Sequence, residues 1–146
     1  MKARMNIAEL EPNGYKRVLT LENYIQASDL DKTHLELIKI RASQINGCAF
    51  CINMHTKDAM AQGETAQRIF LLNAWRETNI FTPEERTILA MTEEVTKIHE
   101  AGLSEETYQA AKSLFTENYI AQIILAIATI NVWNRIAITS HTQPEL

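Results

Sequence analysis

Apolar residues recur at spacings of three and four along nearly the whole chain, and they never alternate at period two over a useful length. The run Leu35, Ile38, Ala42 and Ile45 is the clearest case, and Gly47 follows it. Residues spaced in this way lie on one side of an α-helix, whereas a half-buried strand needs strict alternation. The sequence therefore predicts an all-α fold of roughly seven helices.

Helix start and stop signals place these helices along the chain. Ser, Thr and Asp residues precede apolar stripes as caps, and glycines follow several of them. Thr82-Pro83-Glu84-Glu85 is the strongest start signal, because it combines a cap, a proline at the first helical position and a capping-box glutamate. We expect helices over residues 15–28, from an Asp31 or Thr33 cap to Gly47, over 48–62, from Thr65 through Trp75, from Thr82 to Gly102, from Ser104 through Phe115, and from a Thr116 cap to Ile138.

The length and the apolar content suit one domain with one core. The chain has 146 residues, of which 46% are hydrophobic. We expect residues 1–146 to form a single domain, in which Pro12-Asn13-Gly14 ends an N-terminal arm over residues 1–14. The last helix is apolar nearly all round, so it should lie centrally or at a subunit contact.

Charge and hydropathy exclude several classes of partner. The net charge is −4 and the 14 basic residues are scattered, which argues against nucleic acid. The N-terminus carries no charged region followed by an apolar one, so we expect no secretory signal. The most apolar stretch, Tyr119–Ile138, is interrupted by polar residues, which argues against a membrane span. We expect a cytoplasmic protein.

The two cysteines of the chain lie close together, at Cys48 and Cys51, and His55 follows one helical turn later. If Cys48 opens a helix, the three side chains share one face. A helix N-terminus stabilises an anion, and a thiol there has a lowered pKa. In a reducing compartment such a pair of cysteines is more often catalytic or metal-binding than a structural disulfide. The stretch therefore indicates redox chemistry.

Two interpretations without redox chemistry compete with this one. Buried cysteines are often only small hydrophobic residues. Zinc could be bound by Cys48, Cys51 and His55, with Glu36 or His99 as the fourth ligand. Structural zinc usually joins two separated half-sites, and no second Cys/His pair is present, so we predict no metal and no cofactor.

The spacing Glu36-x11-Cys48-x2-Cys51-x3-His55 resembles the core motif of the AhpD-like alkylhydroperoxidases in the carboxymuconolactone decarboxylase superfamily. The resemblance extends over approximately residues 15–140. Further segments that match the family's pattern are Gly63-Glu64-Thr65, Ala74-Trp75-Arg76-Glu77-Thr78, Phe81-Thr82 and Ile130-Asn131-Val132-Trp133-Asn134-Arg135.

The resemblance implies an all-helical peroxidase whose cysteines cycle between dithiol and disulfide. By position, Cys51 matches the peroxidatic cysteine, Cys48 the resolving cysteine, and Glu36 and His55 the proton relay. It further implies a hydroperoxide substrate and a homo-oligomer, trimer or hexamer. An external thiol or dithiol must act as reductant, because no flavin, nicotinamide or haem motif is present. Decarboxylases of the superfamily lack the cysteine pair, which argues against that activity.

Two other functions remain open at this stage. The family's well-studied peroxidases carry a second histidine between the cysteines, where this chain has Phe50. A protein thiol-disulfide reductase or stress-response redox partner with weak peroxide turnover is therefore the alternative. A non-catalytic helical scaffold is the third possibility, in which Glu36 would be a solvated charge beside Lys39 or Lys32.

Overall fold

The computed structural model describes residues 2–145, and over that range it contains eight α-helices, one 3-10 helix and no strand. The all-α prediction is confirmed, with the short α1 as the additional helix. In chain order the elements are α1 (Ile7–Leu10), α2 (Pro12–Gln26), α3 (Lys32–Asn46), α4 (Ala49–Ala61), α5 (Ala66–Leu71), the 3-10 helix η1 (Leu72–Glu77), α6 (Pro83–Thr96), α7 (Glu105–Leu114) and α8 (Glu117–Ser140).

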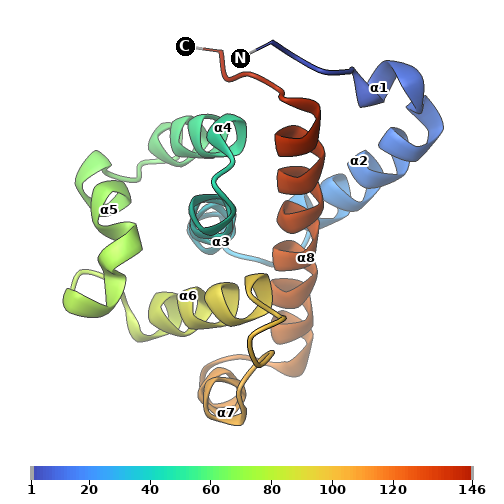
Figure 1. The fold of residues 1–146 in the computed structure, drawn as a ribbon. Coiled ribbons are helices and arrows are strands. Elements are labelled where there is room, and N and C mark those ends of the chain that lie inside the picture. The colour runs from blue at the N-terminus through green and yellow to red at the C-terminus, as the bar shows by residue number, and fades with distance from the viewer. Residues whose placement is uncertain (1, 146) are drawn as a thin grey trace.

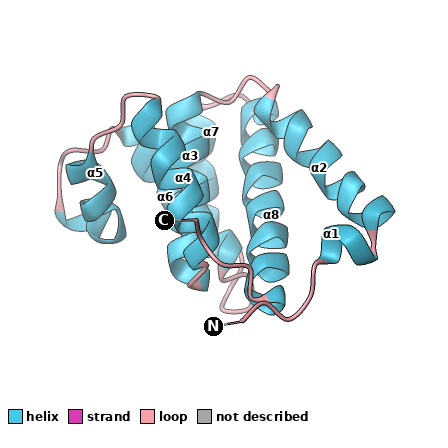
Figure 2. Cartoon of the chain, turned by 90° about the horizontal axis from the view of Figure 1, so that it is seen from above, coloured by secondary structure: helices cyan, strands magenta, loops and turns pink. Residues whose placement is uncertain are grey.

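Helix α3 is the centre of the fold. It packs against α4, α6 and α8, while α2 packs along α8 on the far side (Figure 1). Figure 2 shows α8 standing between α2 and the group formed by α3, α4 and α6. The N-terminal segment runs past the C-terminal end of α8, where the backbone N–H of Arg4 donates to the carbonyl of Ser140 at 2.9 Å. The ends of the chain therefore close over the C-terminal end of α8.

Two apolar clusters cover opposite sides of α3. One is formed mainly with α6 and α8 and includes Leu35, Ile38, Ile88, Ile123 and Ile127. The other is formed with α5, η1 and α6 and includes Leu37, Ile40, Leu72, Trp75 and Leu89. Because α3 is enclosed on both sides, its polar residues Glu36, Lys39 and Ser43 are buried as well.

The predicted caps are confirmed where the signal is local. Asp31, Thr82, Ser104 and Thr116 each accept a backbone N–H in the first turn of the helix that follows, and the full capping box is present at Thr82. Such a cap stabilises a helix by about 1 kcal/mol. Gly47 ends α3 in the left-handed conformation, at φ 73°.

The predicted N-terminal arm over residues 1–14 is wrong. Asn6 caps the short helix α1, and Pro12 is the first residue of α2, which continues through Gly14. A proline at the first helical position loses no hydrogen bond, and its fixed φ suits the helix. The Pro12-Asn13-Gly14 cluster therefore starts a helix instead of ending a segment.

Three further boundaries differ from the prediction. Helix α6 ends at Thr96, not at Gly102, and Ile98 beyond it is 60% exposed. Helix α7 ends at Leu114, one residue before the predicted Phe115. The expected helix through Trp75 becomes the 3-10 helix η1 after Leu71, and η1 is itself kinked at Ala74, whose dihedral angles are non-helical.

Helix α8 is long and apolar enough to cross a membrane by length and composition alone, but half of its most apolar window is buried inside the fold. It serves as a core helix, as predicted from its nearly uniform apolar surface. Its one arginine, Arg135, donates to the backbone carbonyl and the side-chain oxygen of Asn131 at 2.9 and 3.0 Å.

Candidate active site

The helical hairpin α3–Gly47–α4 carries all four predicted site residues. The left-handed Gly47 reverses the chain, and the N–H of Cys48 donates to the carbonyl of Ser43 at 3.0 Å. Because α4 then runs back along α3, His55 lies opposite Glu36 at the other end of the hairpin. A single turn thus brings together residues that are 19 positions apart.

Cys48 caps α4, and Cys51 lies in the first turn of that helix. The two sulfur atoms form a disulfide, with 5.4 Å between the Cα atoms, and each residue is 1% exposed. The Cys48 sulfur also accepts the N–H of Cys51 at 3.4 Å. The cysteine pair therefore sits at the N-terminal end of a central helix, where unsatisfied N–H groups and the helix dipole favour negative charge.

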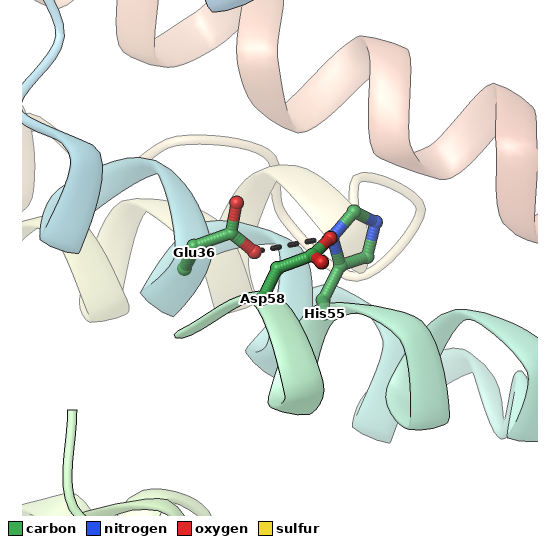
Figure 3. A group of neighbouring side chains, drawn as sticks. All are labelled: Glu36, His55 and Asp58. Carbon is green, nitrogen blue, oxygen red and sulfur yellow. Dashed lines mark hydrogen bonds and ion pairs between the residues drawn. The ribbon is translucent and has the colours of Figure 1, made fainter. Parts of the chain in front are cut away.

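His55 contacts two carboxylates (Figure 3). Its Nδ1 atom lies 3.1 Å from Oε2 of Glu36 and 3.8 Å from Oδ2 of Asp58. His55 and Glu36 are 5% and 4% exposed, whereas the Asp58 side chain is 53% exposed. An ionised carboxylate can only accept a hydrogen bond, so Nδ1 carries a proton and the lone pair of a neutral ring is left on Nε2. The arrangement fixes one tautomer of the histidine.

Asp58 was missed by sequence reasoning, although its position three residues after His55 places it on the same helix face. The zinc alternative needed both cysteines, His55 and either Glu36 or His99, but the two sulfurs are bonded to each other and His99 is exposed beyond the end of α6. Glu36, His55 and Asp58 place one ligand atom each within 4.8 Å of one another. Both carboxylates face the same ring nitrogen, which is the geometry of a hydrogen-bonded histidine.

A cleft of about 640 Å³ opens beside Cys51 and His55, and we call it the large cleft. Its walls come from the N-terminal segment, α2 and α8, and most of the lining side chains are apolar, including Ile7, Tyr15, Leu19, Trp133 and Ile136. A cleft with a mainly apolar lining and some polar groups is typical of a binding site for a small organic molecule.

A second cleft of about 270 Å³, the small cleft, is lined by Cys48 but not by Cys51. Ile138 and Pro144 contribute to it, and Phe50 lines both clefts. The residue that replaces the family's second histidine therefore stands where the two clefts meet. The two cysteines of one disulfide thus line different clefts.

A partly buried ion pair contributes to the polar lining of the large cleft. The Lys39 ammonium donates to Oε1 of Glu22 at 2.5 Å, and the Trp133 indole N–H donates to Oε2 at 3.2 Å. Burial would raise the pKa of the Glu22 carboxyl, but the hydrogen bonds from Lys39, Gln26 and Trp133 outweigh burial and hold this pKa below its ordinary value. Lys39 was expected only as a surface partner of Glu36. It is instead 1% exposed and bonded to α2.

Comparison with known proteins adds three findings. The profile of the carboxymuconolactone decarboxylase family matches residues 12–94. The uncharacterised protein YdfG of Bacillus subtilis (strain 168) is 43% identical over 138 residues, which is 94% of each chain. A crystal structure from Agrobacterium tumefaciens, of a protein of unknown function suggested to be the antioxidant defence protein AhpD, superposes with a TM-score of 0.97 at 41% identity over 99% of each chain.

The debrominase Bmp8 also shares the fold. Its apo structure superposes with a TM-score of 0.83 over 94% of this chain and 74% of its own. The identity is 18%, so this likeness concerns the fold alone.

Proposed function

Because the chain belongs to the carboxymuconolactone decarboxylase family as an AhpD-like member, we propose that it is a thiol-dependent peroxidase that reduces organic hydroperoxides. The observation that carries the proposal is the disulfide between Cys48 and Cys51 at the start of α4, with Cys51 facing the same cleft as a histidine that is bonded to a buried glutamate.

In the first step the thiolate of Cys51 attacks the O–O bond of the hydroperoxide. A sulfur–oxygen bond forms, the O–O bond breaks, and an alkoxide leaves. Cys51 becomes a sulfenic acid while the peroxide is reduced to an alcohol, once a proton reaches the leaving oxygen. His55 is the proton carrier, and Glu36 holds its ring.

In the second step the Cys48 thiol attacks the sulfenic acid of Cys51. A disulfide forms and water leaves, which protects Cys51 from further oxidation. Placing Cys48 on the same turn of helix gives it a high effective concentration. The disulfide present in the structure corresponds to the end of this step.

In the third step an external thiol or dithiol reduces the disulfide through a mixed disulfide. The reductant gives up two electrons and two protons, and both cysteines return to thiols. The small cleft beside Cys48 supports an approach of the reductant that does not require the alcohol product to leave the large cleft first.

A second candidate function is protein thiol-disulfide reduction with weak peroxide turnover. The observation that favours it is Phe50, an apolar residue that lies between the two cysteines in the sequence and lines both clefts. In that case Cys48 would act as the attacking thiol toward a partner disulfide.

One titration separates these candidates. Reduced protein is mixed with cumene hydroperoxide, and free thiols are counted over time. Loss of two thiols per chain within seconds supports the peroxidase. Slow loss, combined with fast exchange with a model disulfide, supports the reductase, and an inert sample would return the cysteines to a structural role.

We further propose that the chain is a single domain over residues 1–146 that acts in the cytoplasm as a trimer or hexamer. Three apolar side chains of α8, Ile124, Leu125 and Val132, remain 38–39% exposed and support a contact between copies. A sedimentation mass of one chain at micromolar concentration would contradict the oligomer.

A further inference from the structure

We propose that Lys39 is a positioning residue of the site, whose buried ammonium stabilises the thiolate form of Cys51, and that Glu22 limits this effect as its counter-charge. The inference rests on the proposed use of Cys51 as a nucleophile. It concerns a pair of side chains that the peroxidase steps above do not use.

The α3–α4 hairpin places Lys39 and Cys51 at a similar level along its length. Glu36 meets His55 at one end, and Ser43 bonds to Cys48 at the other. Lys39 lies between Glu36 and Ser43 on α3, as Cys51 lies between His55 and Cys48 on α4. Both Lys39 and Cys51 also line the large cleft.

The burial of Lys39 is unusual, because lysine is almost never fully buried unless it is paired. Lys39 is 1% exposed, and its ammonium bonds to Glu22 at 2.5 Å. Glu22 is further held by Gln26 Nε2 at 3.0 Å and by Trp133 Nε1 at 3.2 Å. Replacing a buried ion pair by apolar residues is often neutral or stabilising, so stability alone is a weak account of the pair.

The other charged groups near Cys51 do not supply a fixed cation. Besides Lys39 and Glu22, the titratable side chains that line the large cleft are Tyr15, His55 and Asp58, and Glu36 lies behind His55. Helix α8 contributes Trp133, Ile136, Ala137 and Ser140, which carry no charge. Lys39 is therefore the one permanent positive charge among the described residues that line this cleft.

The two halves of the pair act on the thiolate with opposite sign. Removing the Lys39 charge leaves the Glu22 carboxylate without its counter-charge, and this negative charge disfavours the thiolate form of Cys51. Removing the Glu22 charge leaves the ammonium and favours that anion. A purely structural pair predicts something different, since either substitution would then loosen the same contact between α2 and α3 and change Cys51 in the same direction.

The test measures how fast iodoacetamide alkylates Cys51 as a function of pH, in reduced protein that carries Cys48→Ser so that one thiol reacts. Serine is a good N-cap and keeps the start of α4. Lys39→Met should move the midpoint of the pH profile up by about one pH unit, and Glu22→Gln should move it down. Lys39→Arg keeps the charge and should leave the midpoint within a few tenths of a unit.

Midpoints that move in the same direction in Lys39→Met and Glu22→Gln, or an unchanged midpoint in Lys39→Met, would overturn the proposal. If circular dichroism shows that Lys39→Met does not fold, the double variant Glu22→Gln/Lys39→Met replaces it, because it leaves no unpaired buried charge. Its midpoint must still lie above that of Glu22→Gln.

Alkylation involves no peroxide, so it separates this proposal from the proposed function. A protein that shows the opposite shifts but fails to reduce cumene hydroperoxide would refute the peroxidase and keep the role of Lys39. A protein that reduces the peroxide but shows no such shifts would support the peroxidase and refute the role of Lys39.

Discussion

The Nδ1 atom of His55 lies 3.1 Å from Oε2 of Glu36, and this contact joins α4 to α3 at the base of the large cleft. Both side chains are about as buried as the surrounding core, at 5% and 4% exposure. A hydrogen bond in such a place holds the imidazole in one orientation, because both side chains are largely removed from solvent.

Glu36→Gln should therefore slow oxidation of the reduced thiols by cumene hydroperoxide. We expect a decrease of about ten- to a thousandfold at neutral pH, within the range of general acid–base contributions, and a flatter acid limb of the pH profile. Stopped-flow measurement of thiol loss across pH provides the check. The control is Asp58→Asn, whose carboxylate is 53% exposed and more distant, at 3.8 Å. If both variants lost the same factor, Glu36 would have no special part in the relay.

The two cysteine variants should fail at different steps. Cys51→Ser should abolish peroxide consumption, because it removes the attacking sulfur. Cys48→Ser should allow one equivalent of peroxide to react and then stop, because no disulfide can form. Mass spectrometry after one addition of peroxide should find sulfenic or further oxidised Cys51 in Cys48→Ser. Oxidation of Cys48 in Cys51→Ser, with none in the converse variant, would reverse the two roles.

The two clefts should separate the two half-reactions. Ile138 lines only the small cleft, and Met54 lines only the large one; both are exposed, at 42% and 40%. Ile138→Trp should slow reduction of the disulfide by dithiothreitol and leave oxidation by cumene hydroperoxide nearly unchanged. Met54→Trp is the matched variant and should show the opposite pattern. Equal effects of each variant on both half-reactions would mean that one opening serves both.

The carboxylate of Glu93, which lies away from the candidate active site, should make the free energy of unfolding depend on pH. Glu93 accepts hydrogen bonds from Arg41 Nε and Trp75 Nε1, both at 2.9 Å, and from Arg76. Burial would raise the pKa of Glu93, but these hydrogen bonds outweigh it and lower the pKa. The stabilisation is therefore present above the ordinary pKa of about 4.3 and is lost as the pH falls through the lowered value.

Glu93→Gln should then reduce the free energy of unfolding by about 1–3 kcal/mol at pH 7, and by progressively less below about pH 4. Urea unfolding at pH 7 and at pH 3.5 measures both quantities. Glu106→Gln, at an exposed position of α7, is the control and should change stability by less than about 0.5 kcal/mol. A difference that stays constant between the two pH values would show that the charge of Glu93 is not what stabilises the protein.

Local signals predicted much of the fold correctly. The caps at Asp31, Thr82, Ser104 and Thr116 were found because a cap depends on a few neighbouring residues. Gly102 misled the prediction of the end of α6. It does adopt a positive φ of 70°, but in the connection to α7 and not at the end of the helix.

The burial of Glu36 and Lys39 could not be predicted from the sequence, because it depends on tertiary packing. A glutamate and a lysine on α3 are expected to be solvated, and only the packing of α2, α4 and α8 around this helix buries Glu36 and Lys39. Glu36 was still identified, because its distance from the cysteines matched a family pattern. Lys39 and Asp58 had no such pattern, and both were missed as neighbours of the site.

The helical hairpin carries the four residues of the proposed chemistry between positions 36 and 55, while much of the wall of the large cleft comes from both ends of the chain. Chemistry and recognition are thus encoded in separate stretches of sequence. Substitutions at Ile7, Leu19 or Ile136 can change which molecules reach Cys51 without altering the reaction that occurs there. A scaffold divided in this way can acquire a new substrate by remodelling its ends and keep its reactive centre untouched.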